Sequence, residues 1–133
     1  MQKNILRIAA IFGVIAVILG AFGAHSLETL ANNGKLEIER LKTWETAVQY
    51  QFYHTFALCV LALSFSGLHQ KYAVYAKNFF MAGIFIFCGS LYLLTLSPLF
   101  AGKELAWFGA ITPIGGLFFI AGWIMFILAL SKK

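Results

Sequence analysis

The sequence predicts an all-α fold: an integral membrane bundle of four transmembrane helices. Hydrophobic residues make up 61% of the 133 residues and charged residues only 11%, whereas soluble proteins average about 45–50% and 25%. The charges lie between four uncharged apolar stretches, each long enough to cross a bilayer, at 8–24, 47–68, 79–97 and 105–131. We therefore expect a single transmembrane domain over residues 1–133, with spans at about 5–24, 45–68, 76–97 and 107–130.

The basic residues are scattered over loops and ends, so the net charge of +5 does not indicate a nucleic-acid partner. With four spans, both termini and the middle loop share one side of the membrane. That side carries six of the ten basic residues and no acidic residue: Lys3, Arg7, Lys71, Lys77, Lys132 and Lys133. Because cytoplasmic loops are enriched in lysine and arginine, both termini are predicted to be cytoplasmic.

The first span begins with Lys3 and Arg7 before an apolar run, as signal peptides do. Its small residues nevertheless follow a 4-3-4-3 spacing: Ala9, Gly13, Ala16, Gly20 and Gly23. This spacing places them on one helix face, where a neighbouring backbone can approach closely. The stripe favours a retained span over a cleaved signal.

The second span is expected to belong to one long helix, from about residue 36 to residue 68. Leu41, Trp44, Val48 and Phe52 have helical spacing and run directly into the apolar stretch. At 1.5 Å per residue this helix measures roughly 50 Å, against about 30 Å of hydrocarbon. Its first two or three turns should therefore extend outside the membrane.

The third span carries small residues every seven positions, and the fourth contains Pro113. Proline removes one helical hydrogen bond and clashes with the carbonyl four residues earlier. The helix either kinks at Pro113, which we favour because residues 105–131 are uncharged, or begins anew with Thr112 as its N-cap. The residues expected to form packing seams are Gly13, Gly20, Gly23, Gly83, Gly89, Ser90, Gly109, Pro113, Gly115 and Gly116.

Polar residues cluster where the second span enters the membrane. Glu45, Gln49 and Tyr53 share an arc of about 100° on a helical wheel, with His54 beside it and Gln51 opposite. Ionisable residues in spans mostly face the bundle interior. We therefore expect an outward-opening pocket that binds a ligand through His25, Glu45, Gln49, Tyr53, His54 and Thr112.

A simpler interpretation is that these polar residues hold helices together, at about 0.6 kcal/mol per hydrogen bond. Glu45 could equally be solvated or paired with Lys42 or His25. His25, Glu45 and His54 do not have the spacing of a known metal site, so we expect no metal and no cofactor. Cys59 and Cys88 lie inside spans and are expected to act as small apolar fillers.

Several segments resemble those of one known family in order and spacing. They are Gly20-Ala21-Phe22-Gly23-Ala24-His25, Trp44 through His54, Cys88-Gly89-Ser90-Leu91-Tyr92, and Gly109 through Gly116 followed by Gly122-Trp123. The chain resembles domain-of-unknown-function family 423, whose animal members are named transmembrane protein 256. The resemblance implies a bacterial inner-membrane protein with several spans, and it brings no known activity or site residue. Cys88 departs from the family, where a residue such as serine is expected.

Four functions compete at this stage. The favoured one is a binding or accessory module with an outward-facing pocket for a lipid headgroup or small ligand. The alternatives are a small-solute or proton-coupled transporter acting as an oligomer, and a structural subunit of a membrane complex. A lipid-acting enzyme is least favoured, because the chain has no nucleophile motif and no aspartate, and we expect no catalytic residue. The expected partners are membrane lipids, and either further copies of the chain or a larger complex.

Overall fold

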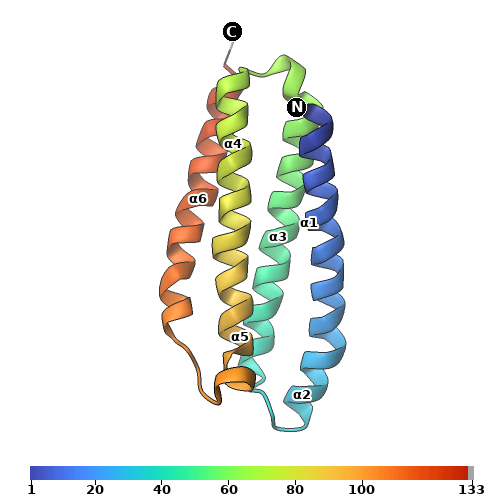
Figure 1. The fold of residues 1–133 in the computed structure, drawn as a ribbon, viewed down its shortest axis with the longest axis vertical. Helices are drawn as coiled ribbons and strands as arrows, with labels where there is room; N and C mark the ends of the chain where they lie inside the picture. Colours follow the sequence, from blue (N-terminus) through green and yellow to red (C-terminus); the bar gives the residue numbers. More distant parts are fainter. Residues whose placement is uncertain (132–133) are drawn as a thin grey trace.

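Four helical columns lie side by side in the computed structural model, which describes residues 1–131 (Figure 1). The first column consists of α1 (Gln2–Phe22), a π-helical turn (Gly23–Leu27) and α2 (Glu28–Asn32). The second is α3 (Glu39–Ser64), followed by a short 3-10 turn (Phe65–Gly67). The third consists of α4 (Gln70–Gly83), a second π-helical turn (Ile84–Cys88) and α5 (Gly89–Ala101). The fourth is α6 (Trp107–Ala129).

The two ends of the bundle differ in what they contain. The N-terminus, the turn from α3 to α4 and the end of α6 lie together at one end, which we call the terminal end (Figure 1). The opposite end, the loop end, contains α2 and the connections 33–38 and 102–106. Gly34 and Gly102 adopt positive φ angles of 69° and 67° where α2 and α5 end, a conformation that glycine adopts without a steric penalty.

Three columns present to the core a face with alternating spacings of three and four residues. In α1 the buried positions are Ile5, Ala9, Phe12 and Ala16. In α3 they include Trp44, Ala47, Gln51, His54, Leu58 and Leu61. In α6 they are Gly115, Phe119, Gly122, Phe126 and Ala129. This spacing is typical of helices that pack in a left-handed bundle, with side chains of one helix inserted between those of the next.

The core is built from two tightly packed helix pairs, α1 with α3 and α4 with α6. Between α4 and α6 two phenylalanines pack on two glycines: Phe119 on Gly83 and Phe80 on Gly122. One turn away, Gly115 lies directly against the backbone of Phe87 in the second π-helical turn. These glycines allow the approach that small residues provide in membrane helices.

The predicted seam residues differ in how closely they are approached. A Cβ at Gly23 or Gly115 would overlap its neighbour, whereas at Gly13, Gly20, Gly109 and Gly116 it would lie 3.5–3.9 Å from the nearest atom. Nothing lies within 4 Å of such a Cβ at Gly89, and Pro113 is exposed. Close packing is therefore concentrated at a few glycines.

Three of the four columns are long and apolar enough to cross a membrane: Gln2–Asn32, Gln70–Ala101 and Trp107–Ala129. Helix α3 is less apolar because Gln49, Gln51 and His54 interrupt its first half. It is also shorter than the expected 36–68. Its 26 residues span about 39 Å, because the chain tightens into the 3-10 turn after Ser64. The four-span arrangement stays a prediction.

Helix α6 is continuous from Trp107 through Pro113 to Ala129. The alternative in which Thr112 caps a new helix is therefore wrong. Thr112 is inside the helix, and its hydroxyl donates to the Phe108 carbonyl at 3.3 Å. The kink at Pro113 stays a prediction.

Candidate functional site

Helix α3 carries polar side chains on two opposite faces. His54 is buried as expected, whereas Gln51 and the arc of Glu45, Gln49 and Tyr53 lie on the sides opposite to those expected. Gln51, predicted to lie opposite the functional arc, is 2% exposed in the core. Glu45, Gln49 and Tyr53, predicted to face the interior, are exposed, Tyr53 by 57%. The core-facing side of α3 follows the three- and four-residue spacing that begins at Trp44, and that spacing excludes Glu45 and Gln49.

Buried hydrogen bonds join α3 to its neighbours. The Gln51 side-chain amide donates to the Phe12 carbonyl at 3.0 Å, and the Tyr92 hydroxyl donates to the Gln51 carbonyl oxygen at 2.9 Å. The Trp44 indole N–H donates to the Leu19 carbonyl at 2.8 Å, and its ring packs 4.6 Å from that of Tyr92. Gln51 thus connects α1, α3 and α5 through a single side chain.

We expect Gln51→Leu to destabilise the bundle by about 1–3 kcal/mol, because the half-buried Tyr92 hydroxyl would lose its acceptor and the Phe12 carbonyl its donor. Tyr92→Phe removes that hydroxyl and should cost less, about 0.6 kcal/mol. In the double variant Tyr92→Phe should recover part of the Gln51→Leu loss. Unfolding with SDS in mixed micelles measures all three, and strictly additive losses would contradict this coupling.

His54 is held between α3 and α6. Its Nδ1 lies 2.8 Å from the Tyr50 carbonyl, which can only accept, so Nδ1 carries the proton. Nε2 then accepts from the Trp123 indole N–H at 3.3 Å. The imidazole also stacks on Phe119, with ring centroids 3.4 Å apart and planes at 9°. Both ring nitrogens are therefore occupied, Nδ1 by a contact within α3 and Nε2 by a contact that joins α3 to α6.

The remaining predicted residues, Thr112 and His25, are not among the residues that line a groove with Glu45 and Gln49. Thr112 shares a 2.7 Å hydrogen bond with Ser90, which joins α5 to α6. His25 is exposed on the first π-helical turn. The structure therefore does not bring the six predicted residues into one pocket. Only Glu45 and Gln49 line the groove described next.

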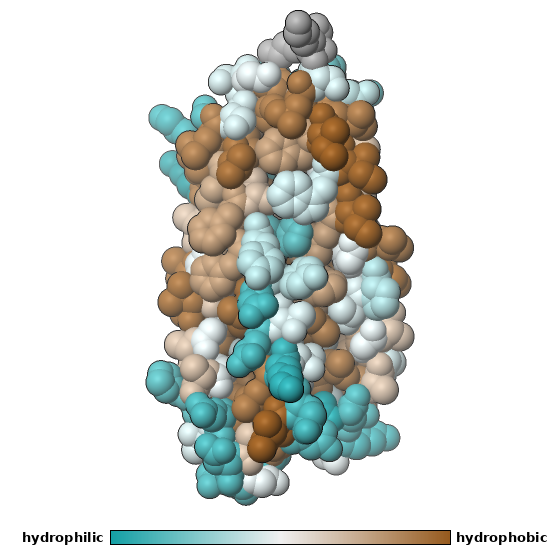
Figure 2. Space-filling model, turned by 180° about the vertical axis from the view of Figure 1, so that it is seen from behind, coloured by the Kyte–Doolittle hydropathy of each residue, from teal (hydrophilic) through white to brown (hydrophobic). Residues whose placement is uncertain are grey.

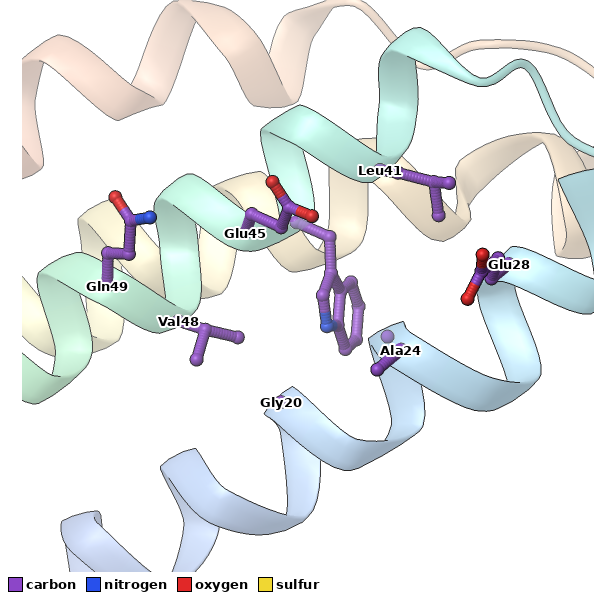
Figure 3. Close-up of a pocket in the computed structure, with 9 residues that line it drawn as sticks. Gly20, Ala24, Glu28, Leu41, Glu45, Val48 and Gln49 are labelled. Atoms are coloured by element: carbon purple, nitrogen blue, oxygen red, sulfur yellow. The ribbon is translucent and has the colours of Figure 1, made fainter.

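A groove of about 340 Å³ opens at the loop end between the first column and α3 (Figure 3). Glu28 of α2 borders it on one side and Glu45 of α3 on the other. The Trp44 indole lies between the two columns, where it contacts Gly23 and donates to the Leu19 carbonyl. Trp44 can lie there because Gly23 has no side chain: a Cβ at Gly23 would overlap the indole. The lining residues are Gly20, Gly23, Ala24, Glu28, Leu41, Trp44, Glu45, Val48 and Gln49.

The charge of the groove is negative. Its lining includes two glutamates and no lysine, arginine or histidine. Within residues 1–131 both ion pairs belong to Arg40, and neither Glu28 nor Glu45 is part of one. The same part of the chain has no group of three or more histidine, cysteine or acidic residues placed to hold a metal ion. The groove can therefore attract a cationic or hydrogen-bond-donating group.

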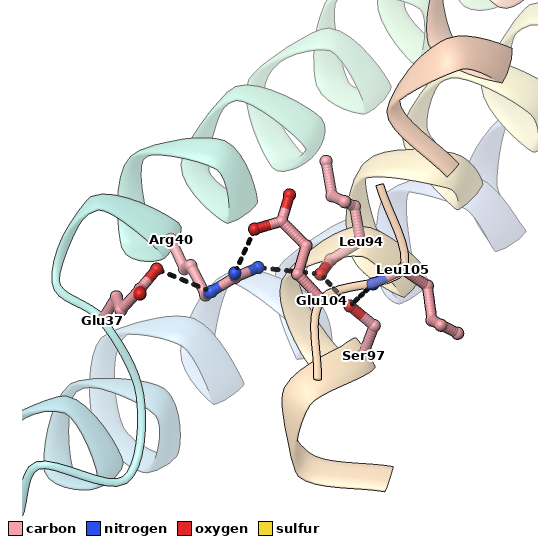
Figure 4. A network of polar contacts seen from close by, with 6 residues as sticks. All are labelled: Glu37, Arg40, Leu94, Ser97, Glu104 and Leu105. Carbon is pink, nitrogen blue, oxygen red and sulfur yellow. Dashed lines mark hydrogen bonds and ion pairs between the residues drawn. The ribbon is translucent and has the colours of Figure 1, made fainter. Parts of the chain in front are cut away.

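A second polar arrangement, which we call the Arg40 clamp, joins three segments at the loop end (Figure 4). The Arg40 guanidinium donates to the Leu94 carbonyl at 3.2 Å and pairs with Glu104 and Glu37. Beside it, the Leu105 N–H donates to Ser97 Oγ at 3.1 Å. Sequence reasoning missed Arg40. The available signal was its position seven residues before the buried Ala47, on the core-facing side of α3.

The surface around the groove is mixed. Figure 2 shows hydrophilic side chains that extend from the loop end to the middle of an otherwise apolar face. Helix α3 exposes Lys42, Glu45, Gln49, Tyr50 and Tyr53. Elsewhere the bundle exposes large apolar side chains, including Val17 on α1 and Ile127 on α6. Such an apolar surface suits contact with lipid.

Residues 19–116 match the model of the family described as "Protein of unknown function (DUF423)". The chain belongs to this family. The earlier resemblance is thereby confirmed. The matched segment of this DUF423 protein includes the groove residues, Gln51 with its partner Tyr92, and the whole Arg40 clamp.

Relatives of this DUF423 protein are named UPF0382 membrane proteins. One from Bacillus subtilis is 40% identical over 132 residues, and one from Staphylococcus aureus is 41% identical over 131; each alignment covers 98% of both chains. One from Haemophilus influenzae is 38% identical over 125 residues, which cover 93% of this chain and 90% of the relative. No solved structure matches. Membrane location is thus the property that the relatives' names give.

Proposed function

We propose that this DUF423 protein is a membrane-embedded binding module that holds the polar head of a ligand in the groove between α1 and α3. The observation that carries the proposal is the pair Glu28 and Glu45, which face one cavity from two columns and have no ion-pair partner in residues 1–131. Both side chains are exposed at the groove, so their carboxylates face solvent and not the core. These two are available to a ligand.

The proposal includes a four-span topology with both termini in the cytoplasm. Helix α3 lies alongside the three apolar columns, and its buried face packs into the same core (Figure 1). In the sequence, the two termini and the middle loop together carry six lysines and arginines, against four in the other two loops, which supports cytoplasmic termini. We place the bundle in the inner membrane of the cell. The groove would then open toward the outside of the cell.

We expect native mass spectrometry of the protein, released gently from its own membrane, to detect a bound mass on the wild type. The double variant Glu45→Ala/Gln49→Ala should lose that mass, because both side chains line the groove. Tyr53→Ala is the matched control: Tyr53 is exposed on α3 one turn beyond Gln49 and does not line the groove. Wild type without any bound mass, or equal loss from the control, would contradict the proposal.

A second candidate is a structural subunit that associates through α3. The observation in its favour is the exposed polar face formed by Gln49, Tyr50 and Tyr53, since exposed polar side chains often join helices within a bilayer. Cross-linking in native membrane that yields only monomer would exclude it. The transporter alternative gains no such support, because α6 is continuous where that alternative expects a broken helix.

A further inference from the structure

The groove has a chemical preference that can be derived from its walls. Glu28 and Glu45 approach it from α2 and α3, and Gln49 adds a side-chain amide on the α3 side (Figure 3). Two carboxylates attract a positive group and repel a headgroup whose only charge is a phosphate or a carboxylate. Because carboxylate oxygens only accept hydrogen bonds, the best complement is a positive group that also carries N–H donors.

The depth of the groove indicates where that group comes from. The uncharged part of α3 begins directly after Glu45, so the boundary of the hydrocarbon lies near Val48. Glu28, Leu41 and Glu45 then lie at the level of lipid headgroups, whereas Gly20 and Val48 reach the level of the acyl chains. The exposed residues that follow on α1 toward the bilayer centre are apolar: Val17, Ile18, Val14 and Ile11.

We infer that the groove binds the primary-ammonium headgroup of a membrane lipid, with the ammonium between Glu28 and Glu45 and an acyl chain along the exposed face of α1. This inference rests on the proposed function and names the ligand class for the same groove. An ammonium offers three N–H donors, and carboxylate oxygens accept them with charge assistance. A quaternary ammonium has the charge without the donors, and a glycerol headgroup has hydroxyl donors without the charge.

The test is lipid competition on the purified full-length protein, measured by native mass spectrometry. Phosphatidylethanolamine, phosphatidylcholine and phosphatidylglycerol with distinguishable but equally long acyl chains are offered in equal amounts. We expect phosphatidylethanolamine to be retained about tenfold over phosphatidylglycerol, with phosphatidylcholine between them. Glu28→Gln/Glu45→Gln, which preserves size and removes charge, should bring the ratio close to one.

Glu39→Gln is the matched control, because Glu39 is an exposed acid on α3 at the same end and does not line the groove. It should leave the preference unchanged. Retention of phosphatidylglycerol equal to or above phosphatidylethanolamine, or an unchanged ratio in the double variant, overturns the inference and leaves the groove free to bind another ligand. Saturable binding of free ethanolamine without the lipid overturns the lipid source. Absence of any retained ligand overturns the proposed function as well.

Discussion

Gly115→Ala is expected to destabilise the bundle more than any other single methyl group added to this chain. The new Cβ would overlap the backbone nitrogen and Cα of Phe87, as well as its Cβ. Overpacking of a filled core typically costs about 1–3 kcal/mol, even when side chains can move away. Here one helix backbone would have to move away from the other, so we expect the upper part of that range.

Gly116→Ala supplies the matched control, because the nearest atoms to its Cβ are ring carbons of Phe87 at 3.9 Å. Both substitutions add the same helix propensity, up to about 1 kcal/mol, so their difference isolates the overlap. In SDS unfolding from mixed micelles, the free energy of unfolding of Gly115→Ala should be about 2–3 kcal/mol lower than that of Gly116→Ala. Equal stability of the two variants would mean that α6 and the second π-helical turn do not approach as closely as described.

The same reasoning separates rigid from adjustable contacts. At Gly122 the overlap would be with the ring of Phe80, and a ring can be shortened by mutation whereas a backbone cannot. Phe80→Leu should therefore rescue part of the loss caused by Gly122→Ala. Phe87→Leu should not rescue Gly115→Ala. Rescue in both cases would contradict a backbone contact at Gly115.

The helical class and most of the helix positions could be predicted from the sequence because apolar length determines them. Three long apolar columns occur where the uncharged stretches lie. Helix α3 was predicted too long. Its apolar pattern continues past Ser64 to Leu68, and the 3-10 turn that stops it has no proline or charged residue to mark it. Local propensity is weak evidence for a boundary of this kind.

The orientation of α3 was predicted wrongly because polarity was given more weight than spacing. Glu45, Gln49 and Tyr53 share an arc, but the repeat Trp44, Ala47, Gln51, His54, Leu58 and Leu61 identifies the packed face. Spacings of three and four residues select one helix side even when it carries a glutamine and a histidine. That signal was available in the sequence and would have placed Gln51 inside.

The groove could be predicted only in part. Glu45 and Gln49 stand in the right segment, whereas Glu28 is brought to them by α2, whose direction depends on how the first column packs against Trp44. The partners of Arg40 could not be predicted from the sequence, because they also depend on how the helices pack. Leu94 and Glu104 are 54 and 64 residues away in the chain, and no local pattern connects such distant positions.

Arg40→Ala is expected to loosen the whole loop end, at a cost of about 2 kcal/mol. Arg40 is 9% exposed and supplies donors to Leu94, Glu104 and Glu37 at once. Its loss leaves the Leu94 carbonyl without that donor and releases Glu104, which is half exposed and regains water. The stability of Arg40→Lys should fall between that of the wild type and that of Arg40→Ala, because an ammonium cannot reproduce the planar fork of a guanidinium.

Glu37→Gln provides the matched control for the Arg40 clamp, since the Glu37 side chain is 72% exposed and its pair with Arg40 is screened by solvent. Its cost should stay within about 0.5 kcal/mol. Hydrogen–deuterium exchange locates the effect: amides in 102–106 should exchange faster in Arg40→Ala and at the wild-type rate in Glu37→Gln. Unchanged exchange in Arg40→Ala would show that the connection from α5 to α6 is held by Ser97 and the surrounding packing alone.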